Sequence, residues 1–403
     1  MSMRNEVPTG WEDRNLGEIV KFSGGAQPPR STFIYEPEDG YVRLIQTRDY
    51  KTSKYKTYIP SKLARKKCNK DDIMIGRYGP PIFQIFRGLE GAYNVALLKA
   101  IPNEKELNKE YLYYFITQYN VWAFVENLSQ RSGGQTGVDL DQLRKYPFPL
   151  PPLPEQQKIA NILSTVDEKI AVIDQQITAT EELKKGLMQR LLTKGIGHTE
   201  FKDSPLGEIP KSWEVKKISE VADFRNGKGH EKIIDENGAY IVVNSKFISS
   251  DGKVIKKSNQ NLSPLNKGDI TMVMSDVPNG KALSKCYLVD ENGLYTLNQR
   301  ICLIRAKDMM NNYFLYLSIN RNRYFLAFDN GVGQTNLKKS EVLDCLVKLP
   351  SMKEQNEITE ILNNVDTKLQ TQKDKKQAYQ QLKKGLMQQL LTGKIRVNNL
   401  NEA

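Results

Sequence analysis

The stretch PLPPLPEQQKIANILSTVDEKI (residues 149–170) places a run of prolines directly before a strongly periodic helical segment. From Ile159 the apolar residues step by four and three alternately, which is typical of the seam of a coiled coil. The pattern resumes at Leu183, Leu187 and Leu191 after one shift of register. Proline restricts its own backbone and that of the residue before it, so the run is expected to end one fold and to set the direction of a long helix. A plain interdomain linker is the alternative explanation.

The helical segment occurs twice. Shifted by 199 positions, EQQKIANILSTVDEKI (155–170) overlays EQNEITEILNNVDTKL (354–369), and LKKGLMQRLLT (183–193) overlays LKKGLMQQLLT (382–392). Upstream, a Gly-Gln-Thr triplet at 134–136 matches one at 333–335, and GWEDRNLGEIVKFSGG (10–25) is similar to SWEVKKISEVADFRNG (212–227). The chain is therefore two tandem copies of one unit.

Each copy consists of a globular part followed by a helical tail, with boundaries at 1–150, 151–195, 196–350 and 351–403. Runs such as YVRLIQ, DIMIGRY, NVALLKAI, YIVVNS, DITMVMS and RICLIRA indicate strands, whereas residues 110–128 and 312–330 each indicate one amphipathic helix. The second globular part must connect the end of the first tail to the start of the second, so compact packing would make the two tails antiparallel. The sequence predicts an α+β protein: two similar globular domains in a pseudo-twofold arrangement, separated by two long antiparallel coiled-coil helices. The middle of the second seam is polar, so the pairing should be loose there.

Lys and Arg number 59 against 47 for Asp and Glu, a net charge of +12, and the excess lies in the globular parts because the tails are nearly balanced. That balance favours nucleic acid as a partner, with an anionic membrane surface second. No apolar run is long enough to span a membrane and no secretory signal pattern is present, so a cytoplasmic protein is expected. The four cysteines are scattered and only two histidines are present, so a zinc site is not expected.

Catalytic motifs are incomplete. Each Gly-Lys pair lacks the hydroxyl residue that a phosphate-binding loop requires, and the two histidines give a hydrolase triad little support. KFSGGA (21–26) and YGPPIF (78–83) resemble methyltransferase motifs, but Ala26 replaces a glycine that the cofactor needs and Gly79 replaces the residue that accepts the target amine. Methyl transfer by this chain is therefore not expected.

PLPPLPEQQKIANILSTVDEKI (149–170), LKKGLMQRLLTKGIGHTEFKDSPLGEIPKSWEV (183–215) and LKKGLMQQLLTGKI (382–395) resemble the conserved regions of the specificity subunits of type I restriction-modification systems. The resemblance covers the full chain. It implies that 1–150 and 196–350 are target recognition domains that each read one half of a split, double-stranded DNA sequence. It implies that 151–195 is the central conserved region and 351–403 the C-terminal one, each forming a long helix.

The resemblance also implies partners. The helices would dock two methyltransferase subunits and, by analogy within the family, restriction subunits. The chain would have no catalytic residue, metal or cofactor of its own, and S-adenosylmethionine, ATP and Mg would act in the partner subunits. Two alternatives stay open: a self-contained DNA methyltransferase built around YGPPIF, and a coiled-coil scaffold that binds only protein.

Residues that contact DNA are expected among polar and cationic side chains on loops after strands, because Arg and Lys pair with guanine, Asn and Gln pair with adenine, and Lys and Ser hold phosphates. The candidates in the first copy are Gln46, Thr47, Arg48, Lys51, Lys54, Arg77, Tyr78, Arg131 and Gln135. Those in the second copy are Lys228, Asn244, Lys246, Ser275, Lys281, Asn298, Arg300 and Gln334. Each could equally be a solvated surface residue or a turn former, and the Gly-Gln-Thr loops could simply pack on the helices.

Overall fold

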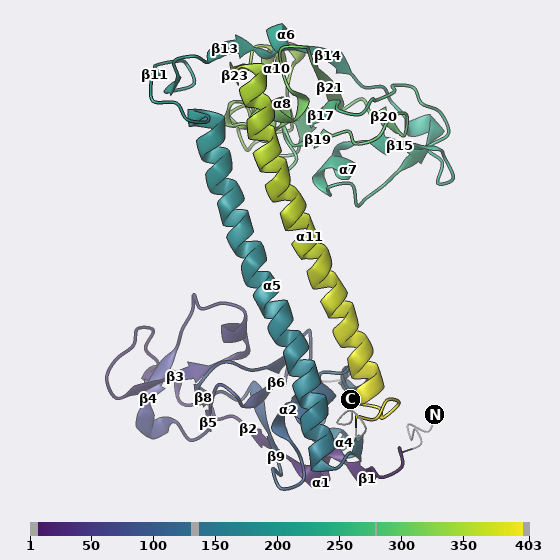
Figure 1. Ribbon diagram of the computed structural model, residues 1–403. Coiled ribbons are helices and arrows are strands. Elements are labelled where there is room, and N and C mark those ends of the chain that lie inside the picture. Colours follow the sequence, from purple (N-terminus) through teal and green to yellow (C-terminus); the bar gives the residue numbers. More distant parts are fainter. Residues whose placement is uncertain (1–6, 130–136, 279, 398–403) are drawn as a thin grey trace. The chain divides into compact units, whose positions relative to one another are not determined.

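The computed structural model describes residues 7–129, 137–278 and 280–397 (Figure 1). The chain divides into two compact units: unit 1 is Met1–Asp174 with Asp374–Ala403, and unit 2 is Gln175–Lys373. Unit 1 is thus discontinuous in sequence, because it takes in both ends of the chain. Each unit includes part of both long helices, α5 (Leu153–Lys194) and α11 (Met352–Leu390).

The globular part of unit 1 contains two four-stranded sheets. The first has the order β2-β9-β6-β7 and is antiparallel, and the second has the order β4-β3-β8-β5, in which β3 and β8 are parallel. A separate pair joins β1 to β10. The elements are β1 (Glu12–Asn15), α1 (Leu16–Ile19), β2 (Val20–Gly24), η1 (Arg30–Thr32), β3 (Tyr41–Ile45), η2 (Thr47–Tyr50), β4 (Tyr58–Pro60), η3 (Ser61–Leu63), β5 (Lys67–Cys68), β6 (Ile73–Gly76), β7 (Ile85–Phe86), β8 (Gly91–Tyr93), β9 (Leu97–Pro102), α2 (Lys109–Ile116), α3 (Tyr119–Ser129), α4 (Leu140–Arg144) and β10 (Pro147–Leu150).

Unit 2 repeats this plan. Its antiparallel sheet has the order β14-β21-β17-β19, and a second sheet, β16-β15-β20, again has one parallel pair, β15 with β20. The elements are β11 (Phe201–Lys202), β12 (Ile209–Pro210), β13 (Glu214–Lys217), α6 (Ile218–Val221), β14 (Ala222–Asn226), η4 (Glu231–Ile233), β15 (Tyr240–Val243), α7 (Ser245–Ser249), β16 (Lys257–Ser258), β17 (Ile270–Val273), β18 (Ser275–Asp276), β19 (Cys286–Leu288), β20 (Tyr295–Leu297), β21 (Ile301–Ala306), α8 (Asn312–Ile319), α9 (Arg323–Leu326), β22 (Thr335–Asn336), α10 (Lys339–Leu343) and β23 (Leu346–Leu349). The α+β class is confirmed, and all six of the quoted apolar runs contain strands.

The prediction of a single amphipathic helix in each globular part is wrong. In unit 1 the segment is interrupted between α2 and α3, where the hydroxyl of Thr117 donates to the carbonyl of Tyr114. In unit 2 the chain breaks between α8 and α9 because Arg321 has a φ of 54° and the Asn322 side chain caps the next helix by accepting from the amide of Tyr324. Local capping by polar side chains outweighed the apolar periodicity.

The long helices supply part of the core of each unit. In unit 1, Ile159 and Leu163 of α5 and Leu390 of α11 are buried in the same cluster as the strands and α2. In unit 2, Leu191 of α5 and Leu362 of α11 do the same. The globular parts are therefore packed onto the helices rather than tethered to them. No helix in the described residues is long and apolar enough to cross a membrane.

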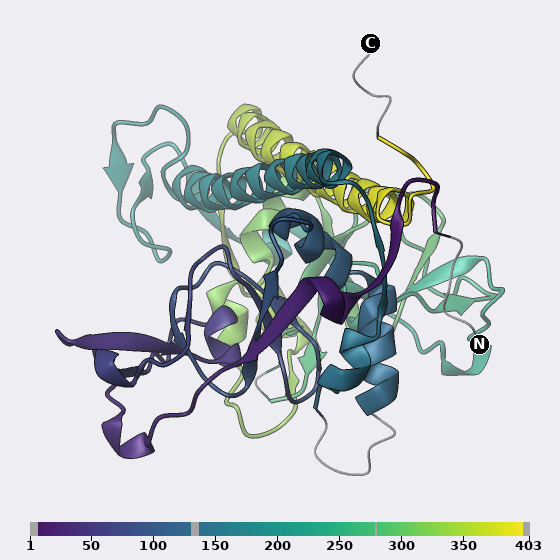
Figure 2. The same ribbon diagram turned by 90° about the horizontal axis from the view of Figure 1, so that it is seen from below.

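Within each unit, the segments of α5 and α11 run antiparallel and lie side by side (Figures 1 and 2). In unit 1, Asp167 pairs with Lys383 at 2.7 Å and Asp174 pairs with Lys376 at 2.6 Å, so the partners descend along α11 as residue numbers rise along α5. Unit 2 shows the same order, since Glu181 pairs with Lys373 at 3.0 Å and Lys184 pairs with Asp366. Interhelical charge pairs of this kind fix the register and the orientation of a helix pair.

The predicted seam is only partly correct. Ile159, Leu163, Val166 and Ile173 are buried, but Leu183 is 52% exposed. Its place against the opposite helix is taken by the next residue, Lys184, whose ammonium group reaches Asp366. The same exchange occurs in the second copy, where Leu382 is 49% exposed and Lys383 faces α5. A charge pair across the helices thus displaces the leucine from the interface.

Candidate nucleic-acid interface

In unit 2 the structure brings four of the predicted residues together. Asn244 and Lys246 follow β15, Asn298 and Arg300 lie between β20 and β21, and all four line one hollow of about 280 Å³. Parallel pairing of β15 with β20 makes this possible, because it places the ends of two strands that are distant in sequence beside each other. The amide of Asn298 donates to the carbonyl of Val243 at 3.1 Å and closes the corner.

The hollow is cationic. Lys256, which the sequence did not single out, joins Lys246 and Arg300 in the lining, and Glu231 is the one carboxylate among the lining residues. Glu231 already accepts a hydrogen bond from the side chain of Gln299 at 3.1 Å. Within the described part of the chain, none of the three cations forms an ion pair. We call these three cations, with Asn244 and Asn298, the basic hollow.

The remaining candidates of unit 2 lie apart from the lining. The Gln334 amide donates to the hydroxyl of Ser275 at 2.6 Å and so ties the loop before β22 to β18. Ser275 is buried, whereas Gln334 is exposed. Lys281 is exposed and lies on the turn that the Asp276 carboxylate holds by accepting from the amide of Ala282. Lys228 is also exposed, and its backbone forms a bridge to that of Asn298.

In unit 1 the predicted stretch after β3 forms a smaller cluster. The side chains of Gln46 and Arg48 both donate to the hydroxyl of Thr57, at 3.3 and 3.4 Å, and Thr57 is only 1% exposed. Thr47 is half-buried between them. The other two candidates, Lys51 and Lys54, are exposed on the following loop.

A second group of candidates in unit 1 follows β6. The guanidinium of Arg77 lies 5.1 Å from the ring centre of Tyr78, and Tyr78 forms a backbone bridge to Gly137. This bridge corresponds to the pairing of Ser275 with Asn336 in unit 2. Arg131 and Gln135 lie outside the described residues.

The second glycine of KFSGGA, Gly25, lies between the motif positions Gly24 and Ala26 and has a structural explanation. A Cβ atom on Gly25 would collide with the carbonyl oxygen of Asn94, and one on Gly227 would collide in the same way with Asn298. The amide of Gly25 donates to Leu97, as that of Gly227 does to Ile301. Both glycines therefore permit a close approach of two backbone segments at the same place in each unit.

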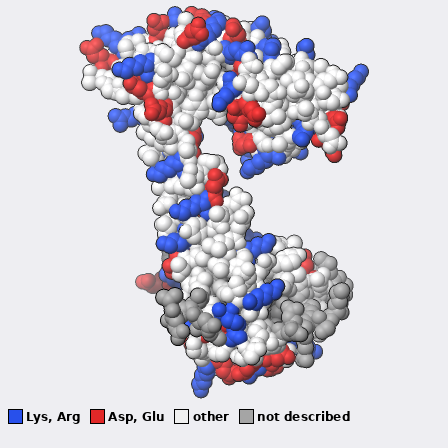
Figure 3. Space-filling view, turned by 45° about the vertical axis from the view of Figure 1, so that its right-hand side comes forward, with Lys and Arg blue, Asp and Glu red and all other residues white. Residues whose placement is uncertain are grey.

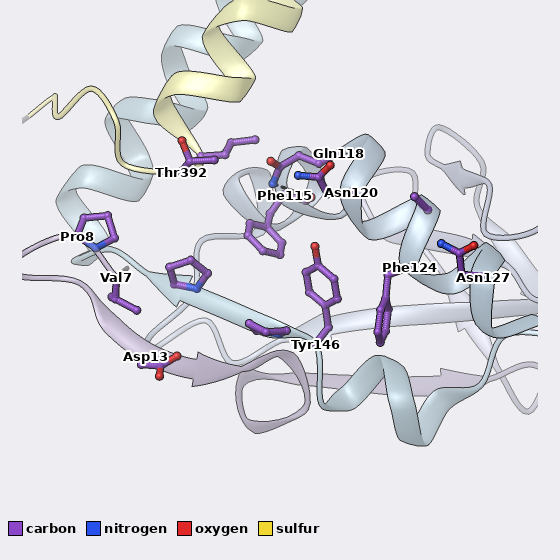
Figure 4. A pocket seen from close by; sticks show the side chains of 14 residues that line it. Val7, Pro8, Asp13, Phe115, Gln118, Asn120, Phe124, Asn127, Tyr146 and Thr392 are labelled. Carbon is purple, nitrogen blue, oxygen red and sulfur yellow. Dashed lines mark hydrogen bonds between the residues drawn. The ribbon is translucent and has the colours of Figure 1, made fainter. Parts of the chain in front are cut away.

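On the side of unit 2 that Figure 3 shows, charge does not mark a continuous basic face. Figure 3 shows basic and acidic side chains interspersed over unit 2 in that view. A larger cavity in unit 1, of about 350 Å³, is lined by Phe115, Phe124 and Tyr146, and the last two rings meet edge to face at 5.1 Å (Figure 4). Its lining residues include no lysine or arginine, so this cavity is not a candidate for phosphate contact.

Each globular part is attached to the start of a long helix through a buried carboxylate. In unit 1, Glu155 of α5 accepts from the indole N–H of Trp11 at 3.0 Å and from the guanidinium of Arg396 at 2.7 and 2.8 Å. In unit 2, Glu354 of α11 accepts from the indole N–H of Trp213 at 2.9 Å. These contacts explain why the Glu and Trp positions recur in both copies.

A second attachment uses the repeated Val-Asp and Leu-Lys-Lys-Gly motifs. In unit 1 the hydroxyl of Tyr114 donates to Asp167 at 2.9 Å, and Lys383 of the opposite helix pairs with the same carboxylate. In unit 2, Tyr313 donates to Asp366 at 2.5 Å, and Lys184 pairs with it. Burial, followed by the hydrogen bond to Asp167, raises the pKa of Tyr114, so its hydroxyl stays a donor at neutral pH.

Tyr114→Phe should lower the free energy of unfolding of unit 1 by about 2 kcal/mol, because it removes one hydrogen bond to a charged acceptor. Tyr113→Phe is the matched control, since the hydroxyl of Tyr113 has no hydrogen-bond partner among the described residues. Urea titration of both variants checks this, and equal destabilisation by the two changes would contradict it.

The family of the chain follows from comparison with known proteins. Residues 8–182 and 210–381 match the family model described as type I restriction modification DNA specificity domain. The chain therefore belongs to that family, and it carries two copies of the domain.

Among its relatives is the type I restriction enzyme MjaVIII specificity subunit of Methanocaldococcus jannaschii, which is 30% identical over 98% of this chain and 95% of that protein. The type I restriction-modification S subunit from M. genitalium has a similar fold, with a TM-score of 0.61, 14% identity, and coverage of 97% and 98% of the two chains. A chain from a study of complex assembly and conformational transition of the type I system gives a TM-score of 0.55 at 15% identity, covering 97% of this chain and 100% of that one. The chain is thus a specificity subunit, a DNA-sequence-recognition protein with two domains.

Proposed function

We propose that the globular parts of units 1 and 2 each read one half of a bipartite, gapped DNA target. The observation that carries this proposal is the recurrence, in two copies of one recognition domain, of a polar or cationic surface at the end of equivalent strands: Gln46 and Arg48 after β3, and Asn244 and Lys246 after β15. A domain that reads DNA needs such side chains at exposed strand ends, where they can reach phosphates or base edges.

The helix pair would set the number of unread base pairs between the two half-sites. Both globular parts share a core with α5 and α11, and both are fixed by a Trp–Glu contact and a Tyr–Asp–Lys contact. Attachment at several points supports fixed attachment of each globular part to the helices rather than a flexible tether. The spacing between half-sites would then be a geometric property of the protein.

Catalysis would belong to partner subunits. In this proposal α5 and α11 also dock two methyltransferase subunits, and restriction subunits where these are present. S-adenosylmethionine, ATP and Mg would act there and not in this chain. The replacement of motif residues by Ala26 and Gly79 supports a recognition subunit over a self-contained methyltransferase.

A base-resolution methylation map of the source strain, with and without this gene, tests the proposal. We expect an asymmetric, gapped motif to lose adenine methylation on both strands when the gene is removed. Loss of an ungapped motif, or no loss while the methyltransferase genes are expressed, would contradict it. Methyl transfer to DNA by the purified chain alone would favour the methyltransferase alternative.

A further inference from the structure

We propose that the basic hollow of unit 2 seats one phosphate of the DNA backbone, so that Lys246, Lys256 and Arg300 position the duplex instead of reading its bases. This inference rests on the proposed function. It assigns a ligand class to a site that includes Lys256, a residue that no sequence pattern indicated.

The shape of the site favours a phosphate over a base edge. The three cations line a concave surface of about 280 Å³. In duplex DNA the phosphates protrude from the backbone while the base edges are recessed in the grooves, so base reading requires side chains that project from the protein. A concave surface can receive a protruding phosphate but cannot enter a groove.

The charge of the site points the same way. In the described residues, Lys246, Lys256 and Arg300 have no carboxylate partner, and the one acid in the lining, Glu231, is held by Gln299. Three cations gathered around one hollow repel one another unless an anion lies between them. The Asn244 side-chain oxygen is used to cap α7 by accepting from Phe247 at 2.9 Å, which leaves its amide N–H groups as donors to that anion.

The equivalent corner of unit 1 is built from different side chains. The carbonyl that accepts from the amide of Val242 belongs to Lys256, whereas the corresponding acceptor for Leu44 belongs to Thr57. The Thr57 side chain is buried and takes hydrogen bonds from Gln46 and Arg48, so polar groups of the protein itself satisfy that corner. At this corner of unit 1 a buried threonine therefore stands where unit 2 has Lys256.

Salt-dependent DNA binding by the full-length chain tests the proposal, with Arg300→Met and Lys256→Met compared to Lys267→Met, an exposed cation outside the hollow. Each phosphate contact adds about 0.9 to the slope of log affinity against log salt, so each hollow variant should lose about 0.9 of slope and about fivefold in affinity at 0.15 M salt. A positioning contact should weaken the target duplex and an unrelated duplex equally. The control should change neither quantity, and urea titration should show all three variants folded.

Neutral methylphosphonate linkages then locate the phosphate. The linkages are placed one at a time through the half-site of the second domain. At the seated phosphate, the linkage should weaken binding by the wild-type chain about fivefold, because one counterion-releasing contact is lost. The same linkage should not weaken binding by Arg300→Met any further, because that variant has already lost the contact. If the variants lose affinity only for the target duplex and their preference at one base pair is relaxed, these residues read bases and the proposal is wrong. Unchanged DNA binding by the variants would also contradict it. If the wild-type chain prefers no gapped target at all, the proposed function fails instead, so the two failures are distinguishable.

Discussion

Arg396→Met should lower the free energy of unfolding of unit 1 by about 3 kcal/mol, the cost of leaving a buried carboxylate without its cation. Arg396 lies near the end of the chain, yet its guanidinium pairs with Glu155, whose side chain is 2% exposed, and also donates to the carbonyl of Thr9. Lys394→Met is the matched control, because it removes an exposed cation from the same segment. Hydrogen exchange of amides in the two units checks the effect. Similar loss of protection in both units, or in the control, would contradict it.

The effect of Arg396→Met should also depend on pH. Burial alone would raise the pKa of Glu155, but the hydrogen bonds from Arg396 and Trp11 outweigh it and hold the pKa below its ordinary value of 4.5. A depressed carboxyl pKa contributes stability that is fully present above the unfolded value and is lost as the pH falls through the folded value. The difference between wild type and Arg396→Met should therefore be constant near neutral pH and shrink below pH 4.5.

Glu354→Ala should destabilise unit 2 by about 3 kcal/mol, because it leaves several donors without an acceptor, one of them fully buried. The Glu354 carboxylate accepts from the indole of Trp213, from the imidazole of His198 at 2.8 Å and from the amide of Ile196 at 2.9 Å. Trp213 has no exposed surface, so water cannot replace the lost acceptor for its indole N–H. Glu360→Ala, an exposed change on the same helix, is the control.

Glu354→Gln adds a graded test of the same contact. A glutamine keeps one acceptor oxygen but loses the charge, so it should cost less than alanine and more than the control. Tryptophan fluorescence during urea titration, with Trp11 and Trp122 replaced by phenylalanine in every chain compared, reports the transition of the Trp213 environment. If glutamine and alanine were equally neutral, the carboxylate would not be what fixes this end of α11.

The repeat, the fold class and the long helices could be predicted because they depend on the spacing of residues along the chain, which is read directly from the sequence. The helix breaks at Thr117 and Arg321 could not, since each is produced by a hydrogen bond or a backbone angle that the apolar pattern hides. The exposure of Leu183 was missed for a related reason. Lys184 faces the other helix in its place because it forms an ion pair with Asp366, and that contact is not visible in the local sequence.

The candidate interface was partly predictable. Asn244, Lys246, Asn298 and Arg300 were selected as polar residues at strand ends, and the parallel pairing of β15 with β20 brings them together. Lys256 was missed because it reaches the hollow through antiparallel pairing next to β16, a nonlocal contact that leaves no local signature. Roles for Gln46 and Arg48 depend on Thr57, which is likewise a cross-strand neighbour.

The division of the chain into units has a consequence for biosynthesis. Unit 2 is one continuous segment, Gln175–Lys373, whereas unit 1 needs Glu155 and Arg396 from distant parts of the chain. Because a ribosome delivers the chain from its N-terminus, the first globular part emerges early but cannot complete its core until Leu390 and Val397 have been made. The order of completion is thus the reverse of the order of synthesis: the second recognition domain closes first, and residues that follow it in the chain complete the first.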